Sequence, residues 1–239
     1  MEKSIGPNPG HAATYYAASA RDKRVRPALD GEHMADVCII GAGFTGISAA
    51  LELSEKGYAV IVLEADRIGF GASGRNGGQI VNGYSRDLET IAKRYGQDRA
   101  DRLGEMSLEG GRIIRERVAK YGIECDLVDG GFFAAFTDKQ VREMGEVRAN
   151  WQKHGHDGLE MVSRSEVEKY VKADRYVGGM IDTKGGHIHP LDLVLGEAAA
   201  AESLGAKIFE KAKAVQHDTG PQPFVGTEGG IVKAKHILG

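Results

Sequence analysis

Cysteine is scarce in this chain of 239 residues, which contains only two, Cys38 and Cys125. The two thiols are far apart in the sequence and neither belongs to a C-x-x-C pair. This argues against a disulfide framework, a thiolate metal site and a dithiol redox centre. Cys38 lies within an apolar run, where a buried and unreactive thiol is expected.

Long apolar runs and an excess of one charge are also missing. No run approaches the roughly 18–20 apolar residues of a membrane-spanning helix, and the first residues contain no hydrophobic signal core. The net charge is −3, with acidic and basic residues mixed along the chain. There is no electrostatic basis for binding nucleic acid or an anionic membrane. The composition therefore predicts a soluble, cytoplasmic protein.

Glycine, by contrast, is abundant, with 34 residues, and its spacing carries the first motif. Residues 36–65 read DVCIIGAGFTGISAALELSEKGYAVIVLEA, which predicts an apolar strand, a glycine-rich turn, a helix ending near Gly57 and a second apolar strand. Gly41, Gly43 and Gly46 have the G-x-G-x-x-G spacing of a dinucleotide-binding turn. At each position a Cβ atom would obstruct the turn, the approach of a pyrophosphate or the packing of the helix.

Two flanking pairs of residues complete the predicted nucleotide site. Phe44 and Thr45 open the helix, whose free N–H groups and positive dipole end are expected to face the phosphates. Glu64, followed by Ala65, ends the second strand, where an acidic side chain accepts hydrogen bonds from the adenosine ribose and repels the 2′-phosphate of NADP. The motif alone leaves both FAD and NAD open, and also a parallel-sheet unit without a ligand.

The segment 67–80, RIGFGASGRNGGQI, favours FAD. Its five glycines and few core-forming residues predict an irregular loop whose backbone lies close to a flat or charged group. An NAD site has no need of such a loop, whereas a flavin extends beyond the pyrophosphate and requires donors along its length. A flexible connector is the alternative. We expect Arg75, Asn76 and Gln79 near the isoalloxazine. The candidate contacts of the whole loop are Arg67, Gly71, Ala72, Ser73, Arg75, Asn76, Gly77, Gly78 and Gln79.

The two segments together resemble the FAD-dependent amine oxidases of the D-amino-acid oxidase/glycine oxidase superfamily, and within it are most similar to the gamma-glutamylputrescine oxidase family. The likeness covers nearly the whole chain. Its further segments, in the same order, are TYYAASA at 14–20, NGYSRDLETI at 82–91, EGGRIIRERVAKYGIECD at 109–126, DRYVGGMID at 174–182 and GGHIHPLDL at 185–193.

This resemblance implies an α/β fold, with a Rossmann-like FAD-binding domain of the glutathione-reductase type and part of an α+β substrate domain. It also implies FAD as cofactor, a small amine as substrate, molecular oxygen as electron acceptor and a backbone contact of Val215 with the adenine. The family's reaction converts gamma-glutamylputrescine to gamma-glutamyl-aminobutyraldehyde, ammonia and hydrogen peroxide. It identifies no catalytic residue. The alternatives are an oxidase of another secondary amine or D-amino acid, and a non-catalytic dinucleotide-binding module.

The predicted organisation is an arm (1–33), a discontinuous FAD-binding domain (34–121 and 184–239) and part of a substrate domain (122–183). The expected helices are 87–121, 138–153, 163–171 and 191–204. The expected strands are 123–128, 132–136, 176–182 and 206–210, with a meander over 212–237. Tyr15 and Tyr16 are expected to dock the arm, and the alternative is that they face a partner.

Two further expectations concern length and metals. Superfamily oxidases are much longer than 239 residues, so we expect the N-terminal part of an oxidase, a fragment or truncated gene product that is inactive alone and binds FAD weakly. His187 and His189 resemble a metal pair, but residues i and i+2 of an extended segment point to opposite faces, so no metal is expected.

Overall fold

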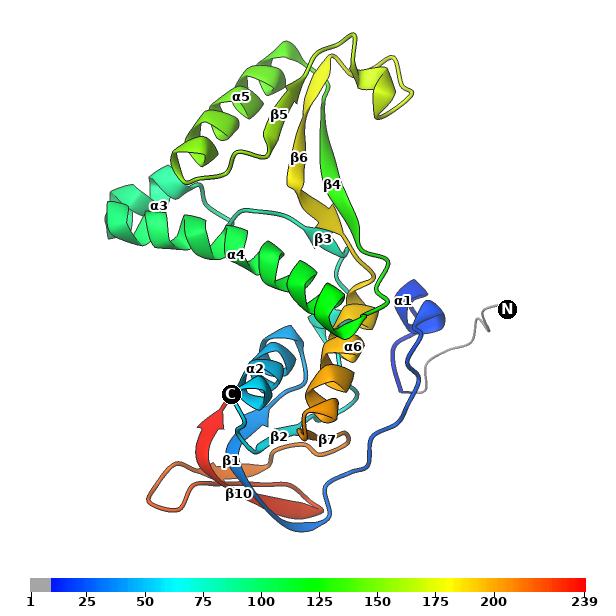
Figure 1. Cartoon of the computed structure of the whole chain (residues 1–239), viewed down its shortest axis with the longest axis vertical. Coiled ribbons are helices and arrows are strands. Elements are labelled where there is room, and N and C mark those ends of the chain that lie inside the picture. The colour runs from blue at the N-terminus through cyan, green and yellow to red at the C-terminus, as the bar shows by residue number, and fades with distance from the viewer. Residues whose placement is uncertain (1–9) are drawn as a thin grey trace. The chain divides into compact units, whose positions relative to one another are not determined.

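The computed structural model describes residues 10–239, so the first nine residues of the predicted arm lie outside the described part of the chain. The chain divides into two compact units (Figure 1). The first contains residues up to Gly77, Arg117–Cys125 and His189–Gly239, and the second contains Gly78–Glu116 and Asp126–Ile188. This division places residues 78–116 with the second unit, whereas the sequence assigned them to the cofactor domain. The predicted domain boundaries remain a prediction.

The first unit is built on a six-stranded sheet with the order β7-β2-β1-β10-β9-β8. Its strands are β1 (Gly31–Ile40), β2 (Val60–Leu63), β7 (Lys207–Phe209), β8 (Gln216–Asp218), β9 (Phe224–Gly226) and β10 (Gly230–Leu238). The four strands β7, β2, β1 and β10 are parallel, with Val37 opposite Val60 and Ile40 opposite Leu63. Every residue of β2 is buried, as expected for a parallel strand covered on both faces.

Two helices, α2 (Phe44–Glu55) and α6 (Pro190–Ser203), pack together in this unit (Figure 1). α6 buries ten of its 14 residues, because Leu, Val and Ala occupy nearly all of its circumference. The short helix α1 (Tyr15–Ser19) lies against α6. The Tyr16 ring packs edge-on against His189 at 4.9 Å, so Tyr16 docks the arm as predicted, whereas Tyr15 is 76% exposed.

The second unit contains an antiparallel sheet in which β6 (Gly178–His187) is paired with every other strand. Its partners are β3 (Gln79–Ile80), β4 (Val128–Ala135) and β5 (Leu159–Val162). β4 is paired with β6 alone and so lies at an edge of this sheet. The helix α5 (Asp138–Lys153) packs on β4, β5 and β6. α3 (Leu88–Tyr95) and α4 (Gln97–Tyr121) lie between β3 and β4 in the sequence, and the last turn of α4 belongs to the first unit.

Two expected elements are wrong, and a third is divided. The helical pattern predicted over 87–121 is confirmed, but it forms two helices, because Gly96 adopts a φ of +93° between them. The strand predicted at 123–128 is irregular up to β4, with Asp126 also at positive φ (+49°). The helix predicted at 163–171 is only a 3₁₀ turn, η2 (Val167–Lys169). It is preceded by a turn in which Ser163 Oγ donates to Glu166 Oε2 (2.6 Å).

The remaining expected helices and strands are present, with β5 and the short strand β3 as additions that the sequence reading missed. Both added strands are short and gain their pairing from β6, which no local pattern encodes. Within residues 10–239, no helix is long and apolar enough to cross a membrane. Cys38 and Cys125 are both buried thiols, and burial raises the pKa of the Cys38 thiol to about 12. The expectation of an unreactive Cys38 is thereby supported.

Candidate cofactor-binding site

The glycine-rich turn between β1 and α2 is shaped by the three glycines of the motif. Gly41 has a left-handed φ of +101°, and its N–H donates to Leu63 O (2.8 Å), which ties the turn to the end of β2. A Cβ atom on Gly46 would lie 2.0 Å from the Gly41 carbonyl oxygen. A Cβ atom on Gly43 would lie 3.0 Å from Ser73 Oγ. The turn therefore requires glycine for its own conformation as well as for any ligand.

The N-terminus of α2 provides the backbone donors. Gly43 is the N-cap residue and has no side chain with which to cap the helix. The first amides of a helix have no intrahelical acceptor, and the helix dipole makes this end partially positive. Phe44 N–H donates to Ser73 Oγ (2.9 Å), and Thr45 is exposed. A helix end without an N-cap side chain, whose amides after Phe44 face no side-chain acceptor from Gly43, fits the pyrophosphate of a dinucleotide.

Glu64 connects the end of β2 to this turn. Its Oε2 accepts the Ala42 N–H (2.7 Å) and its Oε1 accepts the Asp66 N–H (2.9 Å). A carboxylate has about four acceptor directions, so acceptor capacity remains on both oxygens for the hydroxyls of a ribose. The exposed Ala65 follows directly. The position agrees with the predicted ribose contact, but the bond to Ala42, which stabilises the glycine turn itself, was not foreseen from the motif.

The loop after β2 is more ordered than the irregular segment predicted from its glycines. It contains a 3₁₀ turn, η1 (Ala72–Gly74), preceded by the exposed Gly71. The carbonyl of Gly69 lies 2.3 Å from where a Cβ of Gly74 would be, so the turn closes tightly on itself. Ser73, at the centre of the turn, accepts the Phe44 N–H and so joins the loop to the start of α2.

Two polar side chains of the loop bind its own backbone. Arg75 Nε donates to Gly71 O (3.2 Å), and its guanidinium lies 5.4 Å from the centre of the Phe70 ring. Asn76 Nδ2 donates to Ala72 O (3.1 Å) and Ser73 O (2.9 Å). Both residues are exposed, and their role beside the isoalloxazine remains a prediction.

Arg67 has a different environment from the one expected of a phosphate ligand. It is 3% exposed, and its guanidinium forms an ion pair with Glu210 (2.8 Å) and donates to Arg24 O (2.8 Å). These protein groups engage the side chain, so the geometry gives no support to a phosphate contact by Arg67. Sequence reasoning missed Glu210. The available signal was an acidic residue at the end of the strand predicted at 206–210, but its pairing with Arg67 depends on strand order, which the sequence does not show.

The last three candidate contacts of the loop belong to different units. Gly77 is exposed and ends the first segment of the first unit, whereas Gly78 and Gln79 belong to the second unit. Gly78 has a φ of +74°, and its carbonyl accepts the Ile188 N–H (2.8 Å). Gln79 is exposed and lies opposite His187 in the β3–β6 pair.

Val215 precedes β8 and is 56% exposed. Its N–H donates to Gly226 O (2.9 Å), so the amide hydrogen is used in the β8–β9 hairpin. The predicted contact with adenine was through the Val215 backbone, and the N–H of that backbone is already bonded within the sheet.

His189 does not form a catalytic triad, although Ser19 and Asp192 are both close to it. His189 Nδ1 accepts the Asp192 N–H (3.0 Å) and caps α6. The ring proton is therefore on Nε2, which lies 3.0 Å from Ser19 Oγ. A base that activates serine requires the opposite arrangement of the proton. Over the described ranges, no three histidine, cysteine or acidic side chains come together in a way that could hold a metal ion.

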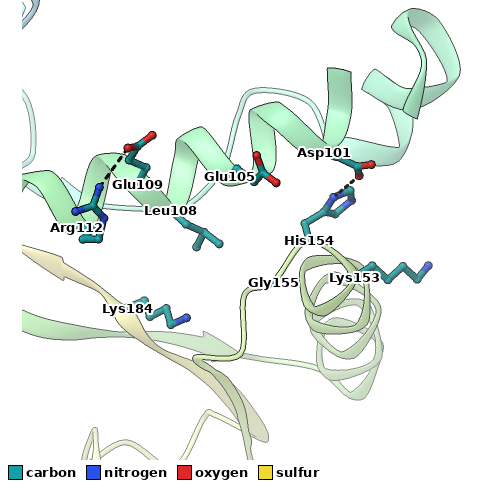
Figure 2. A pocket seen from close by; sticks show the side chains of 9 residues that line it. All are labelled: Asp101, Glu105, Leu108, Glu109, Arg112, Lys153, His154, Gly155 and Lys184. Atoms are coloured by element: carbon teal, nitrogen blue, oxygen red, sulfur yellow. Dashed lines mark hydrogen bonds and ion pairs between the residues drawn. The ribbon is translucent and has the colours of Figure 1, made fainter. Parts of the chain in front are cut away.

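The second unit contains a surface cavity of about 880 Å³ with mixed charges (Figure 2). Asp101, Glu105 and Glu109 lie along α4, and Lys153 and Lys184 are on the other side. The charges are largely paired: Asp101 lies 3.1 Å from His154 Nδ1, and Glu109 forms an ion pair with an arginine one turn later. This paired arrangement offers no nucleophile–base couple.

Comparison with known proteins agrees with the cofactor assignment. A family model described as FAD dependent oxidoreductase matches residues 36–238. The chain is 46% identical over 228 residues to the gamma-glutamylputrescine oxidoreductase of Escherichia coli, covering 95% of this chain and 54% of that protein. It is 42% identical to a probable oxidoreductase, OrdL, of Haemophilus influenzae, covering 86% and 48%. The chain thus spans about half the length of these curated relatives.

Solved structures show the same fold. Glycine oxidase from Geobacillus kaustophilus aligns with a TM-score of 0.67 at 22% identity, covering 86% of this chain and 54% of that one. The FAD-bound L-alpha-glycerophosphate oxidase from Mycoplasma pneumoniae aligns with a TM-score of 0.69 at 19% identity, covering 86% and 53%. At these identities the likeness establishes the fold alone. The predicted α/β class, with a Rossmann-like FAD-binding sheet, is confirmed.

Proposed function

The chain belongs to the family of FAD-dependent oxidoreductases, and from this premise we propose that it is the cofactor-holding part of an oxidase acting on the C–N bond of gamma-glutamylputrescine. The substrate is proposed from the 46% identity to the E. coli gamma-glutamylputrescine oxidoreductase over 95% of the chain. The observation that carries the cofactor role is the N-terminus of α2, which has glycine in place of an N-cap side chain and lies beside the Gly41 turn.

In this proposal the ribose and the pyrophosphate of FAD's adenosine diphosphate part are held by groups that lie close together in the first unit. The amides of α2 that follow Phe44, whose own N–H is accepted by Ser73, would donate to the pyrophosphate, and Glu64 would accept from the ribose while it holds Ala42 in the turn. Ser73 fixes the following loop beside the same helix end. These groups bind and orient; none of them has to move a proton.

FAD, when bound, supplies the oxidation, because it accepts two electrons and a hydrogen from the carbon that bears the amine nitrogen. The proposed overall reaction consumes the amine, water and molecular oxygen, and yields the aldehyde, ammonia and hydrogen peroxide. The amine must be unprotonated to react, and a dry pocket favours that form because burial disfavours an ammonium ion. A cytoplasmic location of the protein is part of this proposal.

The test measures peroxide release with gamma-glutamylputrescine against sarcosine, glycine and D-alanine. It uses the 239-residue chain and, in parallel, the product of the whole gene that encodes it. We expect the whole-gene product to turn over gamma-glutamylputrescine faster than the other three amines. Preference for one of those amines would replace the proposed substrate, whereas a protein that binds NAD and releases no flavin on denaturation would contradict the oxidase assignment.

A further inference from the structure

Glu210 is a buried acid for which the proposed chemistry has no use. It follows β7 and is only 1% exposed. Burying a carboxylate is unfavourable unless hydrogen bonds and an opposite charge compensate for lost water. The contacts that compensate here all come from segments far away in the sequence.

Three donors converge on this carboxylate. Arg67 Nη1 pairs with Oε2 at 2.8 Å. Two backbone groups complete the set, because Arg26 N–H donates to Oε2 (2.8 Å) and Ile68 N–H donates to Oε1 (2.9 Å). Glu210 N–H itself donates to Pro27 O (3.0 Å). One side chain thus joins the N-terminal arm, the entry of the loop after β2 and the end of β7.

The backbone after Glu210 is held in place by its own hydrogen bonds. Lys211 adopts a left-handed φ of +52°, which is uncommon for a residue with a side chain. Its N–H donates to Asp66 O (3.1 Å), and the next N–H, of Ala212, donates to Glu64 O (2.8 Å). The segment therefore lies alongside residues 64–66, which include the predicted ribose ligand.

Ile68, which Glu210 holds, leads directly to the proposed phosphate site. The next residue, Gly69, donates its N–H to Ala42 O (2.9 Å) in the glycine-rich turn. The Gly69 carbonyl oxygen lies 2.3 Å from where a Cβ of Gly74 would be, so the intervening turn is tight. In this turn Ser73 Oγ lies 2.9 Å from Phe44 N at the start of α2. The path from Glu210 to the helix end thus consists of consecutive residues and hydrogen bonds.

We propose that Glu210 is a positioning residue for FAD: through Ile68 and Arg67 it sets the loop that places Ser73 and the glycine-rich turn at the N-terminus of α2. This inference rests on the proposed placement of the FAD pyrophosphate at that helix end. It makes the N-terminal arm part of the cofactor site, because Arg24 and Arg26 contribute to the same cluster. Arm and cofactor then stabilise each other, since each orders the loop that the other contacts.

The chain offers a matched control in a second buried ion pair of the same unit. Glu197 on α6 is 3% exposed and lies 3.1 Å from Arg117 Nη1. Arg117 in turn binds Ser48 Oγ (2.7 Å) in the body of α2, away from the glycine-rich turn. Removing the negative charge at Glu197 takes from a buried arginine its buried partner, as at Glu210, and leaves it with the half-exposed Glu52 at 3.5 Å, but it does not touch the loop.

The experiment compares the full chain with its Glu210→Gln and Glu197→Gln variants by FAD titration and by amide hydrogen exchange without FAD. The glutamine in Glu210→Gln has one acceptor oxygen for two backbone donors and no charge for Arg67. We expect its Kd for FAD to rise about tenfold, against less than about twofold for Glu197→Gln. Faster exchange at Phe44, Ile68 and Gly69 should occur in Glu210→Gln only.

The two readouts separate failure of this inference from failure of the cofactor placement. Equal FAD affinity in the parent and Glu210→Gln, or equal losses in both variants, would overturn the positioning role. If the parent itself binds no FAD, the cofactor placement is wrong, and amide exchange then tests the coupling of Glu210 to the loop. Unchanged exchange at Phe44 and Gly69 in Glu210→Gln would overturn that coupling as well.

Discussion

The helices α6 and α5 show that the two units are stabilised differently. α6, in the first unit, buries ten of its 14 residues, whereas α5, in the second, has 16 residues and none that is fully buried. The first unit also joins distant segments through Glu210 and Glu64, each of which accepts hydrogen bonds from backbone amides. A site for a cofactor requires fixed donors, and the first unit is where packing and buried polar bonds fix them.

The largest effect is expected for Gly46→Ala. The new Cβ would lie 2.0 Å from the Gly41 carbonyl oxygen, and relieving this clash requires a shift of the backbone. We expect a loss of about 3 kcal/mol or more in the free energy of unfolding, together with loss of FAD binding. Urea unfolding and FAD titration measure both.

Gly145→Ala in α5 is the matched control for this substitution. Nothing lies within 4 Å of its Cβ position, so the same change should stabilise the chain by roughly 0.5–1 kcal/mol through helix propensity. Equal changes in the free energy of unfolding for the two variants would contradict the proposed difference in packing between the units.

A second contrast compares Leu191→Ala with Val147→Ala. Leu191 is 1% exposed, and its Cδ1 lies 3.1 Å from the Cβ position of Gly69 and 3.0 Å from that of Gly74. Its truncation should leave a cavity that costs about 3 kcal/mol. Val147 on α5 is 46% exposed, so its truncation should cost under about 0.5 kcal/mol. Chemical denaturation of both variants measures the difference, and a Val147→Ala loss as large as that of Leu191→Ala would contradict the account.

Glu64→Ala tests the polar side of the same comparison. The substitution removes the acceptor for Ala42 N–H and the proposed acceptor for the ribose. We expect the Kd for FAD to rise about tenfold to a hundredfold, the range for one or two bonds to a charged group. Fluorescence titration of FAD measures it. Undiminished affinity would show that this carboxylate stabilises the turn without contacting the cofactor.

The smallest effect is the pH dependence contributed by Glu197. Burial raises its pKa above the ordinary glutamate value, and the nearby Arg117 only partly opposes this. A raised folded-state pKa means that the native state binds the proton more tightly. The stability contribution is therefore full below the unfolded-state pKa and is lost as the pH rises through the folded-state pKa. In urea unfolding series, this decline should be present in the parent and absent in Glu197→Gln; parallel curves would argue against it.

Much of the first unit was predictable because its signals are local. The three glycines, the two apolar strands and Glu64 lie within thirty residues, and their periodicity specifies strand, turn and helix without knowledge of the rest. Arg67 and Glu210 were not predictable in this way, since their partnership depends on the register between β2 and β7. In the second unit, β3 and β5 owe their existence to pairing with β6. Ser163 and Glu166 form a side-chain turn that competes with the expected helix.

The most direct test of the central claim is amide hydrogen exchange of this chain with and without saturating FAD. The account predicts FAD-dependent protection in residues 41–46 and 64–76, the glycine-rich turn, the start of α2 and the loop that Glu210 holds. Protection confined to other segments, or no change in these two, would contradict the placement of the cofactor at this turn.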